Sequence, residues 1–521
     1  MYRKKYIITL DAGTGSGRCL IFDLEGNQIA QAQEEWIPKE IPEYPGSQEF
    51  DTKEAWEILS RTIRTAMAKG DVKPDEVLAI TASSMREGMV LYDRDGNEVW
   101  ACTNLDARAV DEAVELINSG AAERIFKLGG DWVNIIDPPR FLWLKKHLPE
   151  VFNKIGHMNM LSDWVLYKLS GKIITDPSIG SSSGMFDLAK RTWADETIQL
   201  VGLSKDIFPP VYESGTIIGE VTKEAARDTG LLAGTPVVTG GADTQLALIG
   251  VSAVENNSYV IVGGTQWQTA VVTDRPLIDP KFRVRTLCHS MPGFWMTEGI
   301  GFYHGFSTRW FRDAFCQLEK EMARQMGVDP YYLLEKLASQ AAPGSNGIIA
   351  IFSDVMNARR WKHAAPSFLQ FDILSPQTSG KKECYRALEE NAAYVSYGNY
   401  QALLELTNTP ADEIVFCGGS SKGFLWPQIM ADVYGVRIKV PVVKEATSLG
   451  AAMVVGVAMN VYKNLEEAVE RLVRFERVYE PDMKNHNIYQ EYYRKWRAIY
   501  PRMLELTNEG LLKPMWRAPG T

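Results

Sequence analysis

The sequence predicts an α/β protein with two domains and a cleft between them, and three observations support this prediction. The chain has 521 residues, which is more than one hydrophobic core usually accommodates. Its second half repeats the α/β pattern of the first half, although the two halves share no sequence period. Several apolar strands end in glycines followed by polar residues, a pattern typical of turns that bind phosphate.

Composition and charge narrow the class of protein. Hydrophobic residues make up 45% of the chain and charged residues 23%, as in ordinary globular proteins. The net charge of -9 and the lack of a basic run argue against nucleic acid as a partner. No apolar segment reaches the roughly 18–20 residues that span a bilayer, and the amino terminus lacks the apolar stretch of a signal peptide. The six cysteines include no CxxC pair, so we expect a cytoplasmic protein without a zinc site.

The first domain, residues 1–250, is expected to begin with three antiparallel strands. Apolar runs at 6–10 and 18–23 lead through short turns into a third run at 28–33, the pattern of a strand meander. A further apolar run at 77–83 is expected to be a buried strand. The sequence therefore predicts a sheet whose first turn lies between residues 10 and 18.

This first turn reads DAGTGSGR at 11–18 and is a candidate phosphate-binding loop. Its glycines expose backbone N–H groups, Thr14 and Ser16 add hydroxyl donors, and Arg18 adds a fixed positive charge. Asp11 ends the preceding strand, where it is well placed to hold Mg²⁺. The order of residues excludes a Walker loop and argues against a dinucleotide-binding turn. A tight hairpin turn with an exposed Asp and Arg is the structural alternative.

The segment PVVTGGADTQLALIG at 236–250 places a carboxylate directly after an apolar strand and two glycines. The glycines let the backbone turn sharply and approach a ligand closely. Asp243 then stands at the start of the next segment, beside a potential anion site. Asp243 is therefore the candidate catalytic residue.

The second domain, residues 251–521, is expected to repeat these features. A predicted strand at 258–263 runs into Gly264 and Thr265, and a buried strand at 414–416 is followed by the sequence GGSS at 418–421. The second glycine turn is expected to open a helix and to receive an adenosine. Each turn alone has a structural interpretation, since Gly is the commonest turn residue, but together they favour nucleotide binding between two domains.

Together these segments resemble the FGGY family of carbohydrate kinases, within the actin, hexokinase and Hsp70 ATPase superfamily, over essentially the whole chain. The resemblance implies two actin-like (ribonuclease H-like) domains with ATP bound in the cleft between them. The segments that carry it lie at 11–18, 84–87, 104–108, 240–245, 264–265, 416–435 and 441–456.

The resemblance also implies roles for individual residues. Asp243 would be the catalytic base and, with Arg86 and Glu87, would contact the substrate. Mg²⁺ would be held near Asp11 and Asp243. Residues matching the ATP-binding positions are Thr14, Gly15, Ser16, Arg18, Gly264, Thr265, Gly418 and Gly419. Asp106 and Arg108 either line the same pocket or form a supporting ion pair, and the sequence leaves both alternatives open.

Four longer segments, at 84–93, 309–316, 362–368 and 386–393, carry a likeness to a narrower group of these kinases. That group phosphorylates the C5 hydroxyl of linear 4,5-dihydroxy-2,3-pentanedione and so traps a quorum-sensing signal in the cytoplasm. Departures from the general family pattern at Gly15, Gln266 and Arg140 argue against transferring the specificity of xylulose, glycerol or gluconate kinases.

Three other functions compete with this one. The nearest is a pentulose or polyol kinase of the same family, and the others are an actin- or Hsp70-like ATPase switch and a catalytically silent ligand sensor. A switch does not need a polar pocket turn such as Arg86–Glu87. The resemblance also suggests a regulatory partner from the sugar phosphotransferase system, because some family members have one.

Overall fold

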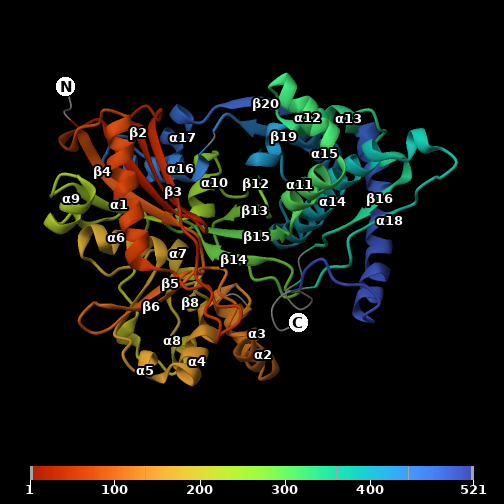
Figure 1. Ribbon diagram of the computed structural model, residues 1–521. Coiled ribbons are helices and arrows are strands. Elements are labelled where there is room, and N and C mark those ends of the chain that lie inside the picture. The colour runs from red at the N-terminus through yellow and green to blue at the C-terminus, as the bar shows by residue number, and fades with distance from the viewer. Residues whose placement is uncertain (1–3, 135, 356, 358–361, 444, 518–521) are drawn as a thin grey trace.

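Two α/β halves, each built on a mixed β-sheet, make up the molecule (Figure 1). The structure is a computed structural model that describes residues 4–134, 136–355, 357, 362–443 and 445–517. Within these residues, the first sheet has six strands in the order β10-β11-β4-β1-β2-β3, and the second has seven in the order β14-β15-β13-β12-β18-β19-β20. The predicted α/β class with two mixed-sheet units is confirmed.

The strands of both sheets have the following bounds. The first sheet contains β1 (Tyr6–Ala12), β2 (Ser16–Asp23), β3 (Gln28–Glu35), β4 (Val77–Ser84), β10 (Ile217–Glu220) and β11 (Pro236–Ala242). The second sheet contains β12 (Tyr259–Gly263), β13 (Trp267–Thr273), β14 (Arg285–Cys288), β15 (Trp295–Gly301), β18 (Glu413–Cys417), β19 (Arg437–Pro441) and β20 (Phe475–Tyr479).

The two sheets share one topology. In the first, β1 pairs antiparallel with β2 and parallel with β4, which pairs parallel with β11. In the second, β12 pairs antiparallel with β13 and parallel with β18, which pairs parallel with β19. An antiparallel edge strand follows in each sheet: β10 pairs with β11 in the first, and β20 pairs with β19 in the second. The repeated α/β pattern predicted from the sequence is therefore a repeat of strand order.

Two helices lie between the sheets and join the halves. Helix α10 (Asp243–Gly250) packs against α16 (Ala446–Ala458), and one hydrophobic core contains side chains from both sheets and both helices. The helices approach so closely that a Cβ on Gly250 would lie 2.0 Å from the Ala446 carbonyl oxygen, and one on Gly450 1.9 Å from that of Leu246. Glycine at both positions is what allows this contact.

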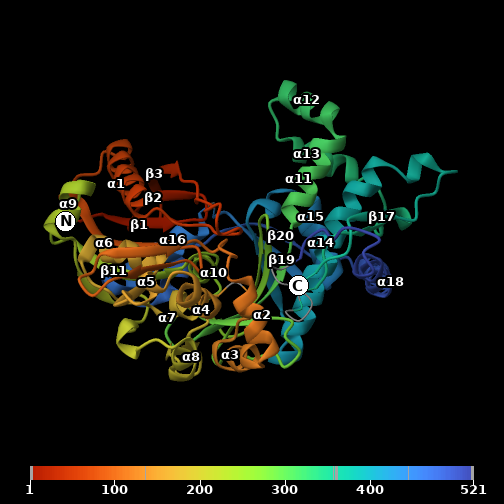
Figure 2. The ribbon, with the colours of Figure 1, turned by 60° about the horizontal axis from the view of Figure 1, so that its bottom comes forward.

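The outer face of each sheet is covered by other helices. The first sheet is covered by α1 (Thr52–Lys69), α6 (Leu161–Ser170) and α9 (Lys223–Thr229), and the second by α14 (Lys381–Thr407), α15 (Leu425–Tyr434) and α18 (Met483–Asn508). Helices α11 (His304–Phe315), α12 (Gln317–Met326) and α13 (Pro330–Ala338) project from the second half (Figure 2). No helix within the described ranges is long and apolar enough to cross a membrane.

A smaller region lies below the first sheet in Figure 1. Its members are β5 (Met89–Tyr92), β6 (Glu98–Cys102), β7 (His157–Met160), β8 (Phe186–Asp187), β9 (Thr192–Trp193), α2 (Val110–Asn118), α3 (Ala121–Gly129), α4 (Asp137–His147), α5 (Pro149–Phe152), α7 (Pro177–Ser181) and α8 (Asp195–Val201). The remaining elements are β16 (Ile349–Ile351), β17 (Ser367–Leu369) and α17 (Leu465–Leu472). Strands β14 and β15 belong to the second sheet but pack against this region of the first half.

Candidate active site

Asp243 is the first residue of α10 and directly follows β11, at the start of a new segment as the sequence predicts. A Cβ on Gly240 would lie 2.0 Å from the Ala82 carbonyl oxygen, and one on Gly241 would lie 2.3 Å from Ser178 Oγ. Gly241 also has a φ of +144°, which side chains rarely adopt. Both glycines are therefore required for the turn that presents the Asp243 carboxylate at the start of α10.

The environment of Asp243 changes its acidity. Burial raises the pKa of Asp243 to about 6, against an opposing effect of Arg86 and with a further increase from the like charge of Asp11. The side chain is not completely enclosed, because part of its surface reaches solvent. Its Oδ1 accepts a hydrogen bond from the Thr244 amide at 2.6 Å. A carboxylate with this pKa is ionised at neutral pH and is a stronger base than an ordinary Asp.

Arg86 and Glu87 follow β4 and lie in a buried cluster of charges. Arg86 Nη1 donates to Glu298 Oε1 at 2.8 Å, and Arg285 Nη1 donates to Glu87 Oε1 at 2.9 Å and to Asp131 Oδ2 at 2.8 Å. Burial would raise the pKa of Glu298, but the Arg86 and Arg285 charges together hold it below the ordinary value. Both arginines are thus paired with carboxylates, as buried charges must be.

The backbone of Glu87 is held in an uncommon conformation. Its φ of +61° lies in the left-handed region, which costs energy for a residue other than glycine. The Glu87 amide donates to Ser182 Oγ at 3.1 Å, and its carbonyl accepts a hydrogen bond from Arg140 Nη1. Arg140, noted in the sequence as a departure from the family pattern, therefore fixes the Arg86–Glu87 turn.

Three members of this cluster were missed by the sequence analysis: Asp131, Arg285 and Glu298. The bonds that join the β14–β15 residues to the first half span 154 to 212 positions along the chain, and no local motif marks them. The one available signal was a single charged residue in each of two otherwise uncharged buried strands, Arg285 in β14 and Glu298 in β15, because charges on buried strands need partners.

The first candidate phosphate loop joins β1 to β2. Arg18 is paired with Asp11, and its Nη1 also donates to Glu445 Oε2 at 3.0 Å. Thr14 Oγ1 donates to Asn104 Oδ1 at 3.3 Å. A Cβ on Gly15 would find no atom within 4 Å, so packing does not require glycine there. The loop therefore presents its backbone to open space, and the charge of Arg18 is shared with two carboxylates.

Asp11 and Asp243 suit a magnesium ion that is completed by phosphate oxygens. The two carboxylates repel each other enough that Asp11 raises the pKa of Asp243, and a divalent cation would relieve that repulsion. Among the described residues, no group of three or more His, Cys, Asp or Glu side chains could hold a metal by itself. A site with only these two carboxylates would need water and substrate phosphates as its other ligands, as Mg²⁺ sites commonly do.

A cavity of about 610 Å³ lies beside the two glycine turns that follow β12 and β18. Of the predicted ATP-binding residues, Gly264, Thr265 and Gly419 line it. Gly418 has a φ of +90°, and a Cβ there would lie 2.6 Å from the Gly263 carbonyl oxygen. This glycine therefore brings the ends of β12 and β18 together at the cavity wall. The other predicted ATP-binding residues of the first half do not line this cavity; they are Thr14, Gly15, Ser16 and Arg18, at and beside the β1–β2 turn.

The loop after Gly419 differs from the prediction. Instead of opening a helix directly, residues Gly419–Lys422 form a 3₁₀ turn, and α15 begins at Leu425. The physical reason is Glu335 of α13, whose Oε2 accepts the amide protons of Phe424 at 2.6 Å and Leu425 at 3.2 Å. The carboxylate thus caps α15 and fixes its start.

Asp106 and Arg108 form an ion pair. Arg108 Nη2 donates to Asp106 Oδ2 at 2.7 Å, and both side chains are buried. The guanidinium lies over the rings of Trp100 and Trp143, at 5.2 and 5.0 Å from their centroids. Between the two alternatives left open by the sequence, this geometry favours the supporting pair.

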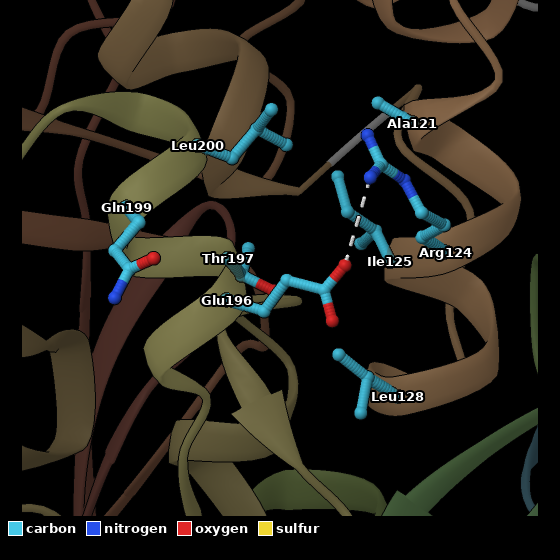
Figure 3. Close-up of a pocket in the computed structure, with 8 residues that line it drawn as sticks. All are labelled: Ala121, Arg124, Ile125, Leu128, Glu196, Thr197, Gln199 and Leu200. Atoms are coloured by element: carbon cyan, nitrogen blue, oxygen red, sulfur yellow. Dashed lines mark ion pairs between the residues drawn. The ribbon is translucent and has the colours of Figure 1, made fainter.

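A separate hollow of about 250 Å³ lies between α3 and α8. Figure 3 shows Arg124 of α3 pointing toward Glu196 of α8, with 3.8 Å between Nη1 and Oε1. Leu128 and Leu200 contribute apolar walls. None of the predicted site residues lines this hollow, so it does not contribute to the candidate active site.

Comparison with known proteins agrees with this arrangement. Over 518 residues the chain is 44% identical to the protein named autoinducer-2 kinase in Yersinia enterocolitica and to that in Salmonella typhimurium, covering 99% of this chain and 98% of each relative. A ligand-bound xylulose kinase from Lactobacillus acidophilus has the same fold, with a TM-score of 0.86 at 22% identity, covering 96% of this chain and 98% of that one.

A second solved structure, Plasmodium falciparum glycerol kinase with ADP, matches with a TM-score of 0.83 at 19% identity, covering 95% of this chain and 98% of that one. The family models for FGGY carbohydrate kinases match in order, the N-terminal domain at residues 6–250 and the C-terminal domain at 259–459. The chain belongs to the FGGY family of carbohydrate kinases.

Proposed function

We propose that this chain is an ATP-dependent kinase that phosphorylates the C5 hydroxyl of linear 4,5-dihydroxy-2,3-pentanedione. The observation that carries the proposal is the 44–45% identity, over 99% of the chain, to proteins named autoinducer-2 kinase. Kinases of the FGGY family use ATP, and the cavity lined by Gly264, Thr265 and Gly419 supports an adenosine site there. The phosphate adds about two negative charges, which would keep the signal inside the cell.

The proposed chemistry places the acceptor between Asp243 and the Arg86–Glu87 turn. The acceptor oxygen forms a bond to the γ-phosphorus of ATP as the bond from that phosphorus to the bridging oxygen breaks, and ADP leaves. Asp243 accepts the hydroxyl proton during this step, for which a pKa of about 6 is suitable. Arg86 and Glu87 can donate to and accept from the acceptor's hydroxyl and hydrated ketone groups.

The phosphate and metal residues complete the proposal. Thr14, Ser16 and the backbone at Gly15 would face the phosphates, with Arg18 adding positive charge once it leaves one of its carboxylate partners. Asp11 and Asp243 would hold Mg²⁺, which neutralises charge on the phosphate oxygens when bound. The other residues of the proposed site then act by positioning the acceptor and the phosphates, because positioning is the main requirement of phosphoryl transfer.

We propose domains at 1–250 and 251–521, the boundary falling between α10 and β12. The family models, which end at 250 and resume at 259, support it. Helix α16 crosses this division in space, because it belongs to the second domain in sequence and packs on α10 of the first.

We further propose a cytoplasmic location and a regulatory partner from the sugar phosphotransferase system. A pull-down with purified proteins of the sugar phosphotransferase system tests that partner, and no association at micromolar concentrations would count against it.

The reaction is tested by identifying its product. The protein is incubated with ATP, Mg²⁺ and freshly prepared 4,5-dihydroxy-2,3-pentanedione, and ADP release and ³¹P NMR spectra are recorded with and without the acceptor. Acceptor-dependent ADP release with a phosphomonoester on C5 is expected. ADP release that is equal without any acceptor would instead support an ATPase switch, and a monoester formed only on xylulose or another sugar would support a pentulose or polyol kinase.

A further inference from the structure

The second half of the chain contributes a ribbon of two strands to the first half. Strands β14 and β15 pair with each other, and β15 pairs with β13 of the second sheet. Their other side is bound to the first half, where the Thr286 amide donates to the Gly130 carbonyl at 3.0 Å and Trp295 Nε1 donates to the Leu188 carbonyl at 2.9 Å. The ribbon thus spans both halves, and Figure 1 shows β14 at the edge of the second sheet next to the first half.

Two charged side chains of this ribbon reach the Arg86–Glu87 turn. Glu298 Oε1 accepts hydrogen bonds from Arg86 Nη1 at 2.8 Å and from Arg285 Nε at 2.7 Å. Arg285 Nη1 in turn donates to Glu87 Oε1 at 2.9 Å. Each residue of the turn is therefore held by one residue of the ribbon, and the two ribbon residues hold each other.

This network is isolated from solvent. Glu298 is 0% and Arg285 3% exposed, so their hydrogen bonds do not exchange with water and removing one charge leaves its partners unpaired. Glu298 Oε2 is buried and has no hydrogen-bond partner among the described residues, which leaves one acceptor oxygen of this carboxylate unused beside Arg86. The pairs are therefore costly to disturb and able to fix side-chain conformations.

We propose that Glu298 and Arg285 are positioning residues of the acceptor site, which hold Arg86 and Glu87 in the conformations that face Asp243. The inference rests on the proposed function for the role of Arg86 and Glu87. It adds that acceptor recognition depends on the sheet that also lines the nucleotide cavity, because β15 pairs with β13, β13 with β12, and β12 ends at the cavity residue Gly263.

The first test is Glu298→Gln, which keeps the volume of the side chain and removes its charge. We expect the KM for the acceptor to rise by about 10–100-fold, because small displacements of positioning groups have effects of this size. The KM for ATP should change less than about twofold, since no ATP group contacts the ribbon in this account. The acceptor used is whichever compound the wild-type protein phosphorylates best.

A matched control is Glu390→Gln on α14. Glu390 is also buried, and its Oε1 accepts a hydrogen bond from Arg386 Nε at 2.9 Å. None of the bonds described for Glu390 joins it to the buried charge cluster around the Arg86–Glu87 turn. This variant should lower the thermal unfolding temperature without changing the acceptor KM. If Glu298→Gln does not fold, Arg285→Lys, which keeps the charge and loses the planar fork, is measured in the same way.

A double-mutant cycle separates positioning from simple destabilisation. If Glu298 acts through Arg86, then Glu298→Gln should have little further effect on acceptor kcat/KM when Arg86 is already Ala. Additive losses from the two substitutions, or an unchanged acceptor KM in a folded Glu298→Gln protein, would overturn the inference. Neither result bears on which acceptor the wild-type protein uses, so failure of this inference is distinguishable from failure of the proposed function.

Discussion

Asp243 combines three properties that a catalytic base needs. It begins a helix after a turn that only glycines allow, its carboxylate keeps some access to solvent, and its pKa of about 6 is closer to neutrality than that of an ordinary Asp. The turn was predictable because PVVTGGADTQ is a local pattern. The raised pKa was not predictable, because it comes first from burial in the folded protein and then from the charges of Arg86 and Asp11, which are distant in sequence.

Replacing Asp243 by Asn tests its role directly. Phosphoryl transfer should fall by about 10²–10⁴-fold, because the amide cannot accept the proton. ATP binding, measured by calorimetry in the same preparation, should persist, since the second-half cavity is unchanged. Turnover near the wild-type rate would remove Asp243 from the base assignment.

The raised pKa of Asp243 predicts a pH dependence of both rate and stability. The base works when ionised, so kcat/KM for the acceptor should fall as the pH decreases through about 6. Because the pKa of Asp243 is higher in the folded protein than its ordinary value of 3.8, ionisation of Asp243 lowers stability as the pH rises from about 4 to about 6. Asp243→Asn should therefore unfold at a higher temperature than the wild type above pH 6, and this advantage should disappear near pH 4. A rate that stays constant down to pH 5 would contradict the assignment.

Arg86 is expected to act on the acceptor. Arg86→Ala should raise the KM for the acceptor and leave the KM for ATP nearly unchanged, because its hydrogen bonds lie in the cluster with Glu298 and not at the nucleotide cavity. Steady-state kinetics with each substrate varied in turn provides the measurement. An equal loss of ATP binding would place Arg86 outside the acceptor pocket.

At the scale of elements, glycine turns were predictable and their partners were not. The hairpin β1–β2 and the strand β12 were predicted because their apolar runs and turns are adjacent in the sequence. The start of α15 was predicted too early, because it is set by Glu335, about 90 residues away. The charged ribbon β14–β15 was missed for the same reason, since its contacts cross from one half of the chain to the other.

Gly418 is the turn residue whose geometry is most demanding. In Gly418→Ala the new Cβ would meet the Gly263 carbonyl oxygen at 2.6 Å in a left-handed conformation. Such strain costs about 1–3 kcal/mol, so the KM for ATP should rise by about tenfold or more while the acceptor KM is unchanged. Gly510→Ala, with a φ of +77° and open space around the Cβ, is the control for conformational strain alone. A normal ATP KM in Gly418→Ala would place the nucleotide elsewhere.

At the scale of the whole molecule, two sheets of equal topology meet around α10 and α16. The α/β class and the repeated design followed from the size of the chain and the order of its glycine turns. The packing between the halves, which depends on the close approach of Gly250 and Gly450, carries no sequence signal that differs from ordinary helical glycines. The buried charge cluster around the Arg86–Glu87 turn has side chains from both halves, whereas the cavity that we propose for the nucleotide is lined by the second half.

The central claim is that this molecule selects 4,5-dihydroxy-2,3-pentanedione among the acceptors that its fold could serve. The most direct measurement is a competition, in which limiting ATP and Mg²⁺ are supplied with equal concentrations of the pentanedione, xylulose, ribulose, rhamnulose and glycerol. The phosphorylated products are separated by chromatography and quantified by mass spectrometry, and their ratio gives the ratio of kcat/KM values. We expect the pentanedione phosphate to be the main product; a sugar phosphate or glycerol phosphate as the main product would rule out the proposed specificity.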